Sequence, residues 1–150
     1  TGKVIVMSKK VLVMNGPNLN MTGIREPQVY GSETLDMINY EIKEYAENLG
    51  IECGFFQSNG EGEIIDAIHS VLSDYDGCII NAGAYTHYSF AIADAVRCVK
   101  KPFIEVHISN PAAREEFRHF SVLAPVCTGT VAGFGKKSYI LAVEALKELL

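Results

Sequence analysis

Short apolar runs alternate along this chain with segments in which apolar residues recur every three or four positions. Continuous runs are typical of strands buried on both faces, and the three-to-four spacing is typical of helices with one buried face. The expected strands are 11–15, 51–57, 77–81 and 102–107, with a weaker one at 125–128. The expected helices are 34–49, 61–72, 88–99, 111–117 and 138–150. This order predicts an α/β fold, a flavodoxin-like three-layer α/β/α sandwich with a five-stranded parallel sheet.

For two of the expected helices, the sequence also predicts where the helix ends or which side chains are buried. Thr34 suits the N-cap of the helix at 34–49, and Gly50 suits its C-terminal stop. The helix at 61–72 is expected to turn four apolar side chains inward: Ile64, Ile65, Ile68 and Leu72.

Residues 15–31, NGPNLNMTGIREPQVYG, interrupt this pattern without any hydrophobic period. Glycine, proline and asparagine dominate the segment, so we expect neither strand nor helix interior there. Connections much longer than about 6 residues tend to be lids or binding loops. Arg25 and Tyr30 place a cation and a titratable phenol on it. The alternative is an ordinary surface loop in which Arg25 and Glu26 form a solvated pair.

Polar side chains stand at the carboxyl ends of the expected strands. Asn15, Asn81 and His107 each end an apolar run. In open parallel sheets, ligands bind beyond these ends. We therefore expect the loops that follow the first, third and fourth strands to meet at one rim.

The segment 105–118, EVHISNPAAREEFR, adds charge to this rim. Asn110 and Pro111 suit the start of a helix, whose N-terminal N–H groups at Ile108 and Ser109 would favour an anion. Arg114 and Arg118 would share a helix face and add positive potential. Glu105 and His107 point to the same side of their strand. A carboxylate there orients the imidazole and favours its protonated form, although a buried structural pair is the alternative.

Composition narrows the classes of function. The 150 residues are 48% hydrophobic, which suits one domain spanning 1–150 with a full core. A net charge of −5 argues against nucleic acid and anionic membranes as partners. No apolar run approaches the ~20 residues of a membrane span. Thr1 to Val6 precede a methionine that resembles a natural start, so we expect those six residues to be an addition and leave them out.

Cysteine and glycine patterns exclude several kinds of site. The four cysteines, at 53, 78, 98 and 127, form no CxxC pair. That predicts free thiols in a reducing, cytoplasmic compartment and no zinc site. The four histidines show no metal-ligand spacing. The Gly-Lys-Lys sequence at 135–137 fails the phosphate-loop pattern, and the glycine cluster at 129–135 is expected to be a loop.

Four motifs in order along the chain resemble those of type II 3-dehydroquinate dehydratases. They are GPNLN at 16–20, REPxxYG at 25–31, NAGAYTH at 81–87, and EVHISN with AREEFR at 105–118. The resemblance runs from about Val11 to the last helix. Thr22 departs from the usual leucine, and Tyr88 and Phe90 are bulkier than usual.

The resemblance implies a cofactor-free and metal-free lyase that converts 3-dehydroquinate to 3-dehydroshikimate and water through an enolate. In that family's scheme Tyr30 is the base, His107 the acid, and Arg25 lies near both Tyr30 and the developing charge. Glu105 supports His107. The substrate is held by a larger set of residues: Asn18, Asn81, His87, Ile108, Ser109, Arg114 and Arg118. Asp94 is expected to reach the site of a neighbouring subunit, because the family assembles trimers into a dodecamer.

A non-catalytic flavodoxin-like binding module is the second class to consider. A phosphoacceptor domain of that kind would need an acidic cluster after the first strand, where this chain has Asn15, and an aspartate at position 81, where it has asparagine. A flavin carrier would need a Ser/Thr-rich phosphate loop, which GPNLN lacks.

Overall fold

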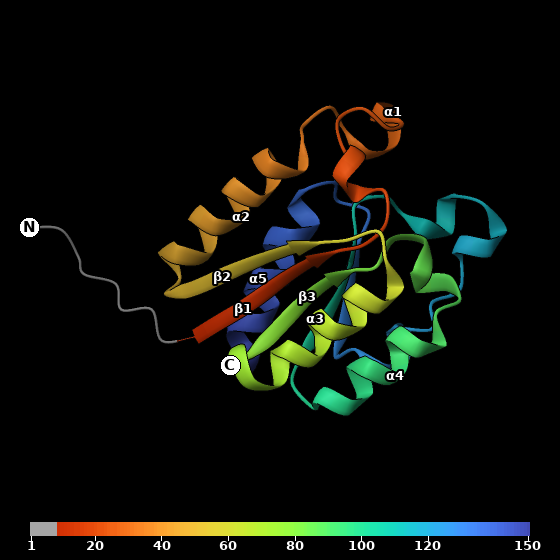
Figure 1. The fold of residues 1–150 in the computed structure, drawn as a ribbon. Coiled ribbons are helices and arrows are strands. Elements are labelled where there is room, and N and C mark those ends of the chain that lie inside the picture. The colour runs from red at the N-terminus through yellow and green to blue at the C-terminus, as the bar shows by residue number, and fades with distance from the viewer. Residues whose placement is uncertain (1–8) are drawn as a thin grey trace, which may run out of the picture.

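The computed structural model describes residues 9–150 (Figure 1). These residues form a sheet of five parallel strands in the order β2-β1-β3-β4-β5. The strands are β1 (Lys9–Asn15), β2 (Ile51–Gln57), β3 (Gly77–Asn81), β4 (Phe103–His107) and β5 (Gly129–Ala132). The predicted flavodoxin-like sheet is confirmed. The segment expected to be an addition, Thr1 to Val6, lies outside the described residues.

Two pairs of helices cover the two faces of the sheet (Figure 1). Helices α2 (Leu35–Asn48) and α5 (Lys137–Leu149) pack on one face, and α3 (Glu61–Asp74) and α4 (Phe90–Val99) on the other. Strand residues alternate between the two cores, as the pleat requires: Val11 and Val13 face α2 and α5, while Leu12 and Met14 face α3 and α4. Each such buried side chain contributes about 1.5–3 kcal/mol.

The capping residues predicted the ends of α2 correctly, whereas the apolar pattern predicted the buried face of α3 only in part. The Thr34 hydroxyl accepts the N–H of Met37 at 3.3 Å, and Gly50 follows α2 with a φ of 77°. On α3, however, Leu72 is 60% exposed. Val71 is buried instead, because Val71 lies on the same face of α3 as Ile64 and Ile68. The helix itself extends to Asp74, two residues beyond the expected end.

The strand expected at 125–128 is wrong. Residues Ala124–Val126 form a 3₁₀ turn, η5, and the edge strand β5 begins at Gly129, inside the segment expected to be a loop. Pro125 lacks the N–H that a ladder requires. Pairing with β4 decides the position, since Glu105 aligns with Thr130 and His107 with Ala132.

Two further expectations about local structure need correction. Residues 111–117 form no helix but two 3₁₀ turns, η3 (Pro111–Ala113) and η4 (Glu116–Arg118), because the backbone of Arg114 between them is extended. The segment 15–31 is not wholly irregular. It contains a 3₁₀ turn, η1 (Leu19–Met21), and one turn of helix, α1 (Pro27–Tyr30).

Candidate active site

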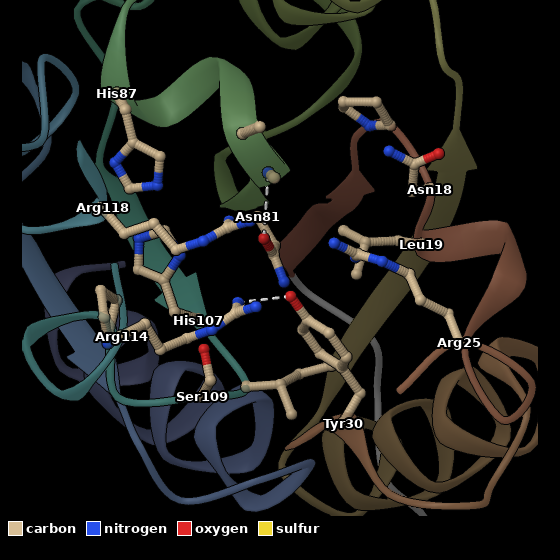
Figure 2. Close-up of a pocket in the computed structure, with 15 residues that line it drawn as sticks. Asn18, Leu19, Arg25, Tyr30, Asn81, His87, His107, Ser109, Arg114 and Arg118 are labelled. Carbon is tan, nitrogen blue, oxygen red and sulfur yellow. Dashed lines mark hydrogen bonds between the residues drawn. The ribbon is translucent and has the colours of Figure 1, made fainter. Parts of the chain in front are cut away.

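A pocket opens where β1, β3 and β4 end, under the segment that carries α1 (Figure 2). The loops after these three strands all contribute to it, as parallel topology predicts. Of the residues expected at a site, the pocket is lined by Asn18, Arg25, Tyr30, Asn81, His87, His107, Ile108, Ser109, Arg114 and Arg118. Loops far apart in the sequence therefore converge on one rim.

Tyr30 lies between two guanidinium groups. Arg114 donates a hydrogen bond of 2.5 Å to the phenol oxygen (Figure 2). The guanidinium carbon of Arg25 lies 4.6 Å from the centre of the Tyr30 ring, and that of Arg114 lies 5.2 Å from it. Both guanidinium groups therefore contact the same phenol. The sequence had suggested only Arg25 as a neighbour of Tyr30.

Glu26 holds both cations in place. Its carboxylate lies 3.7 Å from Nε of Arg25 and 3.6 Å from Nη2 of Arg114. The alternative of a solvated Arg25–Glu26 pair is thus partly right, since the pair exists. It also links the segment 15–31 to Arg114, which follows β4.

His107 and Glu105 form the pair expected from their spacing. Nε2 of His107 lies 2.5 Å from a carboxylate oxygen of Glu105, which is 1% exposed. Glu105 itself is not among the residues that line the pocket; it lies behind His107. Because Nε2 is engaged, Nδ1 is the nitrogen that remains to meet a bound molecule.

Asn81 is held by a residue that the sequence patterns did not single out. Its carbonyl oxygen accepts the N–H of Gly83 at 3.2 Å, and its amide donates to the hydroxyl of Tyr139 at 3.0 Å. Tyr139 in turn donates to Asn15 at 2.5 Å. Asn15, expected at the rim, is therefore buried beneath it, 1% exposed. The 3.6-residue period of α5 was the available signal, because it turns Tyr139 inward.

His87 faces the same pocket with its ring stacked near that of His107, the two centres 6.4 Å apart. Its Nδ1 pairs with the carbonyl oxygen of Phe120 at 2.8 Å. Burial lowers the pKa of His87, and the nearby His107 and Arg118 lower it further, against an opposing contribution from the Phe120 carbonyl. A neutral imidazole is therefore available to hydrogen-bond an uncharged group.

Positive potential in the pocket comes from arginines rather than from a helix end. Turn η3 is too short to give a helix dipole, so the expected contribution of a helix end to the anion site is wrong. Ile108 and Ser109 themselves do line the pocket. Arg114 and Arg118 do line the pocket. Arg118 is anchored by Glu115, with Nε 2.5 Å from the carboxylate.

The pocket is narrow. Its volume is about 40 Å³, whereas ligand pockets usually have about 300–1,000 Å³. Tyr30, Arg25 and Leu19, all from the segment 15–31, form one wall. This segment therefore limits the room that the pocket offers.

The described residues contain no group of three or more His, Cys, Asp or Glu side chains placed to hold a metal ion. Among the helices of residues 9–150, none has the length and apolar character needed to cross a membrane.

Comparison with known proteins agrees with this geometry. Residues 9–147 match the family model described as dehydroquinase class II. The 3-dehydroquinate dehydratase of Caldicellulosiruptor bescii is 61% identical over 143 residues, covering 95% of this chain and 99% of that protein. The type II dehydroquinase of Propionibacterium acnes superposes with a TM-score of 0.92 at 47% identity, covering 95% of this chain and 99% of that one. That of Butyrivibrio crossotus gives 0.90 at 51% identity, covering 92% and 97%.

The chain belongs to the class II dehydroquinase family.

Within this class II dehydroquinase, the departures from the family motifs lie away from the pocket chemistry. The Thr22 hydroxyl is buried and donates to the carbonyl of Leu19 at 2.6 Å, which ties turn η1 together. Tyr88 and Phe90 lie on the surface, 58% and 70% exposed.

Asp94 does not reach the pocket of its own chain. It lies on α4 with its side chain 73% exposed, 3.5 Å from Arg97. Among the residues expected to contact substrate, Asp94 is the one that the structure does not bring into the pocket.

Proposed function

We propose that this dehydroquinase is a 3-dehydroquinate dehydratase, a hydro-lyase that forms 3-dehydroshikimate and water through an enolate. The observation that carries the assignment is the pairing, in one pocket, of a phenol flanked by two guanidinium groups with a histidine backed by a buried carboxylate. The first can supply a base and the second an acid. The reaction belongs to the shikimate pathway or to quinate breakdown.

Tyr30 is the base in this scheme. Its phenolate removes a proton from C2 of the substrate, and the electron pair moves onto the C3 carbonyl oxygen as an enolate. Arg25 and Arg114 stabilise the phenolate before this step. Positioned acid–base groups contribute typically about 10²–10⁴-fold to the rate.

Asn81 stabilises the enolate. An amide nitrogen has two N–H donors, and Tyr139 takes one of them. The second is free to face the developing negative charge. A donor that is already oriented needs no reorganisation during the reaction.

His107 is the acid. It gives its proton to the C1 hydroxyl, the C1–O bond breaks as the enolate collapses, and water departs. Glu105 holds the imidazolium in the required orientation. The substrate loses a proton from C2 and a hydroxyl from C1, and the water that departs consists of this hydroxyl and the proton from His107. The C2 proton stays on Tyr30, so the enzyme returns to its starting state when Tyr30 releases a proton to solvent and His107 takes one up.

The remaining pocket residues bind the substrate. The carboxylate is placed against the backbone N–H groups of Ile108 and Ser109, within the positive potential of Arg118. Asn18 and the neutral His87 bond to hydroxyl groups. None of the residues that line the pocket is a lysine, so an imine intermediate is not part of this proposal, and neither is a cofactor.

The experiment that tests the function is absorbance in the enone band of dehydroshikimate after adding protein to 3-dehydroquinate. We expect a rise that is the same with and without borohydride pretreatment. No rise from folded protein would contradict the function and favour the binding-module alternative. A rise abolished by borohydride would contradict the enolate route.

We also propose that the enzyme is a cytoplasmic homo-oligomer, a dodecamer of trimers, in which Asp94 enters a neighbour's pocket. Asp94 is exposed and is not among the residues that line its own pocket, and the side chains of Tyr88 and Phe90, before it in the chain, are mostly exposed. Exposed aromatic side chains are typical of subunit contacts.

A further inference from the structure

Ser121 lies behind the pocket, outside its lining, between turn η4 and turn η5. Its hydroxyl lies 3.0 Å from each carboxylate oxygen of Glu105. The Ser121 oxygen also accepts hydrogen bonds from two backbone N–H groups, that of Leu123 at 3.1 Å and that of Ala124 at 3.0 Å. The same oxygen therefore contacts four polar atoms.

A serine hydroxyl has one proton and two lone pairs. Backbone N–H groups can only donate, so those of Leu123 and Ala124 occupy both lone pairs of the Ser121 oxygen. Its own proton has one remaining acceptor among these contacts, the carboxylate of Glu105. Because the backbone at turn η5 occupies both lone pairs, Ser121 is the donor and Glu105 the acceptor in their hydrogen bond.

Glu105 accepts this hydrogen bond in a buried environment, where a charged carboxylate requires hydrogen-bond partners. The side chain is 1% exposed. Besides Ser121, it contacts Nε2 of His107 at 2.5 Å and the hydroxyl of Thr130 at 3.4 Å. Hydrogen bonds donated to a carboxylate favour its charged form over the neutral acid.

The charge on Glu105 decides what kind of acid His107 is. When the pair holds two protons, it is either an imidazolium beside a carboxylate or a neutral imidazole beside a carboxylic acid. Only the first presents a strong acid, through Nδ1, to a departing hydroxyl. A donor fixed on Glu105 therefore selects the reactive arrangement.

We propose that Ser121 is a positioning residue that keeps Glu105 as a carboxylate and thereby keeps His107 as an imidazolium. Ser121 does not touch the pocket and acts through Glu105. The inference rests on the proposed function for its kinetic consequence, but the protonation pattern of His107 can be measured without substrate.

The kinetic test compares Ser121→Ala, Ser121→Thr and the remote control Ser70→Ala, whose hydroxyl bonds to Ala67 within α3. Hydrogen bonds to charged groups are worth enough to predict a kcat about 10–100-fold lower in Ser121→Ala, with KM unchanged. Ser121→Thr keeps the donor and should restore kcat, and Ser70→Ala should match wild type. A kcat for Ser121→Ala within twofold of wild type, or a loss confined to KM, would overturn the proposal.

Ser121 also caps turn η5, because its hydroxyl accepts the N–H groups of Leu123 and Ala124. If Ser121 acted only as this cap, its effect on kcat would not depend on Glu105. The double variant Ser121→Ala with Glu105→Gln separates the two roles. If Ser121 acts through the carboxylate, its removal causes no further loss of kcat once Glu105 is glutamine. If the fold-losses of kcat in the two single variants multiplied in the double variant, the proposal would be contradicted.

Nitrogen-15 NMR of histidine-labelled protein without substrate gives an independent answer, with His107 assigned by the loss of its signals in His107→Asn. Near neutral pH we expect both ring nitrogens of His107 to be protonated in wild type, and Nε2 to move toward its unprotonated shift in Ser121→Ala. Unchanged shifts would overturn the proposal, even if the enzyme assignment holds. Absence of dehydratase activity in wild type with the shifts as expected would instead contradict the function alone.

Discussion

At the scale of single residues, the chemistry depends on pairs that meet across the pocket rather than on any side chain alone. Tyr30 meets Arg114, which lies 84 positions later in the chain. A phenol in water is a weak base near neutral pH, because its pKa is about 10. The guanidinium groups of Arg25 and Arg114 change that environment.

Tyr30→Phe tests the base directly. We expect kcat to fall by about 10²–10⁴-fold with little change in KM, because the hydroxyl acts in the chemical step. Formation of the enone is the measurement. Tyr40→Phe, which removes an exposed hydroxyl bonded to Glu44, is the matched control and should retain wild-type rates. A near-wild-type kcat in Tyr30→Phe would remove it from the role of base.

At the scale of secondary-structure elements, one side chain of α5 joins the ends of β1 and β3. The Tyr139 hydroxyl bonds to both Asn15 and Asn81 and is fully buried. Desolvation raises the pKa of Tyr139, with a smaller opposing effect from Asn81, so the hydroxyl stays protonated and can donate. Packing of the helix thus supports the site as well as the core.

Tyr139→Phe should destabilise the fold by about 1–3 kcal/mol, because the buried side-chain N–H of Asn81 and the buried side-chain oxygen of Asn15 both lose their bond to the Tyr139 hydroxyl. Urea unfolding measures this loss. Tyr45→Phe, where the hydroxyl bonds to Glu144 in a partly exposed place, removes a similar contact between α2 and α5 and should cost less. Equal losses in the two variants would mean that burial does not decide the cost.

At the scale of the whole molecule, folding protects the thiols in the two cores. Burial raises the pKa of Cys53 to about 12 and that of Cys127 to about 12, with smaller contributions from nearby glutamates. A raised pKa in the folded state contributes stability that is present below the unfolded value near 9 and is lost as pH rises toward 12.

We therefore expect Cys53 and Cys127 to react slowly with a thiol reagent at pH 8 and rapidly once the chain is unfolded. The unfolding free energy should fall above about pH 9, by at most about 1.4 kcal/mol per pH unit for each thiol. Replacing both cysteines with alanine should make that part of the curve less steep, and the remaining fall should include Cys78, whose pKa burial also raises. Rapid labelling of either thiol in the native protein would contradict the expectation.

Assembly is a property of the whole molecule too. Light scattering should give the mass of an oligomer, and Asp94→Asn should lower activity although Asp94 lies outside its own pocket. Glu52→Gln, on the edge strand β2, is a surface control of the same charge. A monomeric mass together with full activity would contradict a role for Asp94 in a neighbour.

The sequence by itself determined the fold class, four strands to within two residues at either end, and ten of the fifteen residues that line the pocket. It could do so because parallel strands end at one edge, and because runs of apolar residues and helix caps are local signals. Asn81 and His107 were placed by that rule alone. Loop composition and charge had already singled out Arg25, Tyr30 and Arg118. The four motifs then added Asn18 and His87 and gave each of these residues a role.

Only the tertiary structure decided the rest. The place of β5 depended on its register with β4, and the absence of a helix at 111–117 on the extended backbone of Arg114. The partners Arg114–Tyr30, Tyr139–Asn81 and Ser121–Glu105 join residues 84, 58 and 16 positions apart. Contacts between segments brought together by folding leave no period or spacing in a single sequence, so only the tertiary structure shows which donor meets which acceptor.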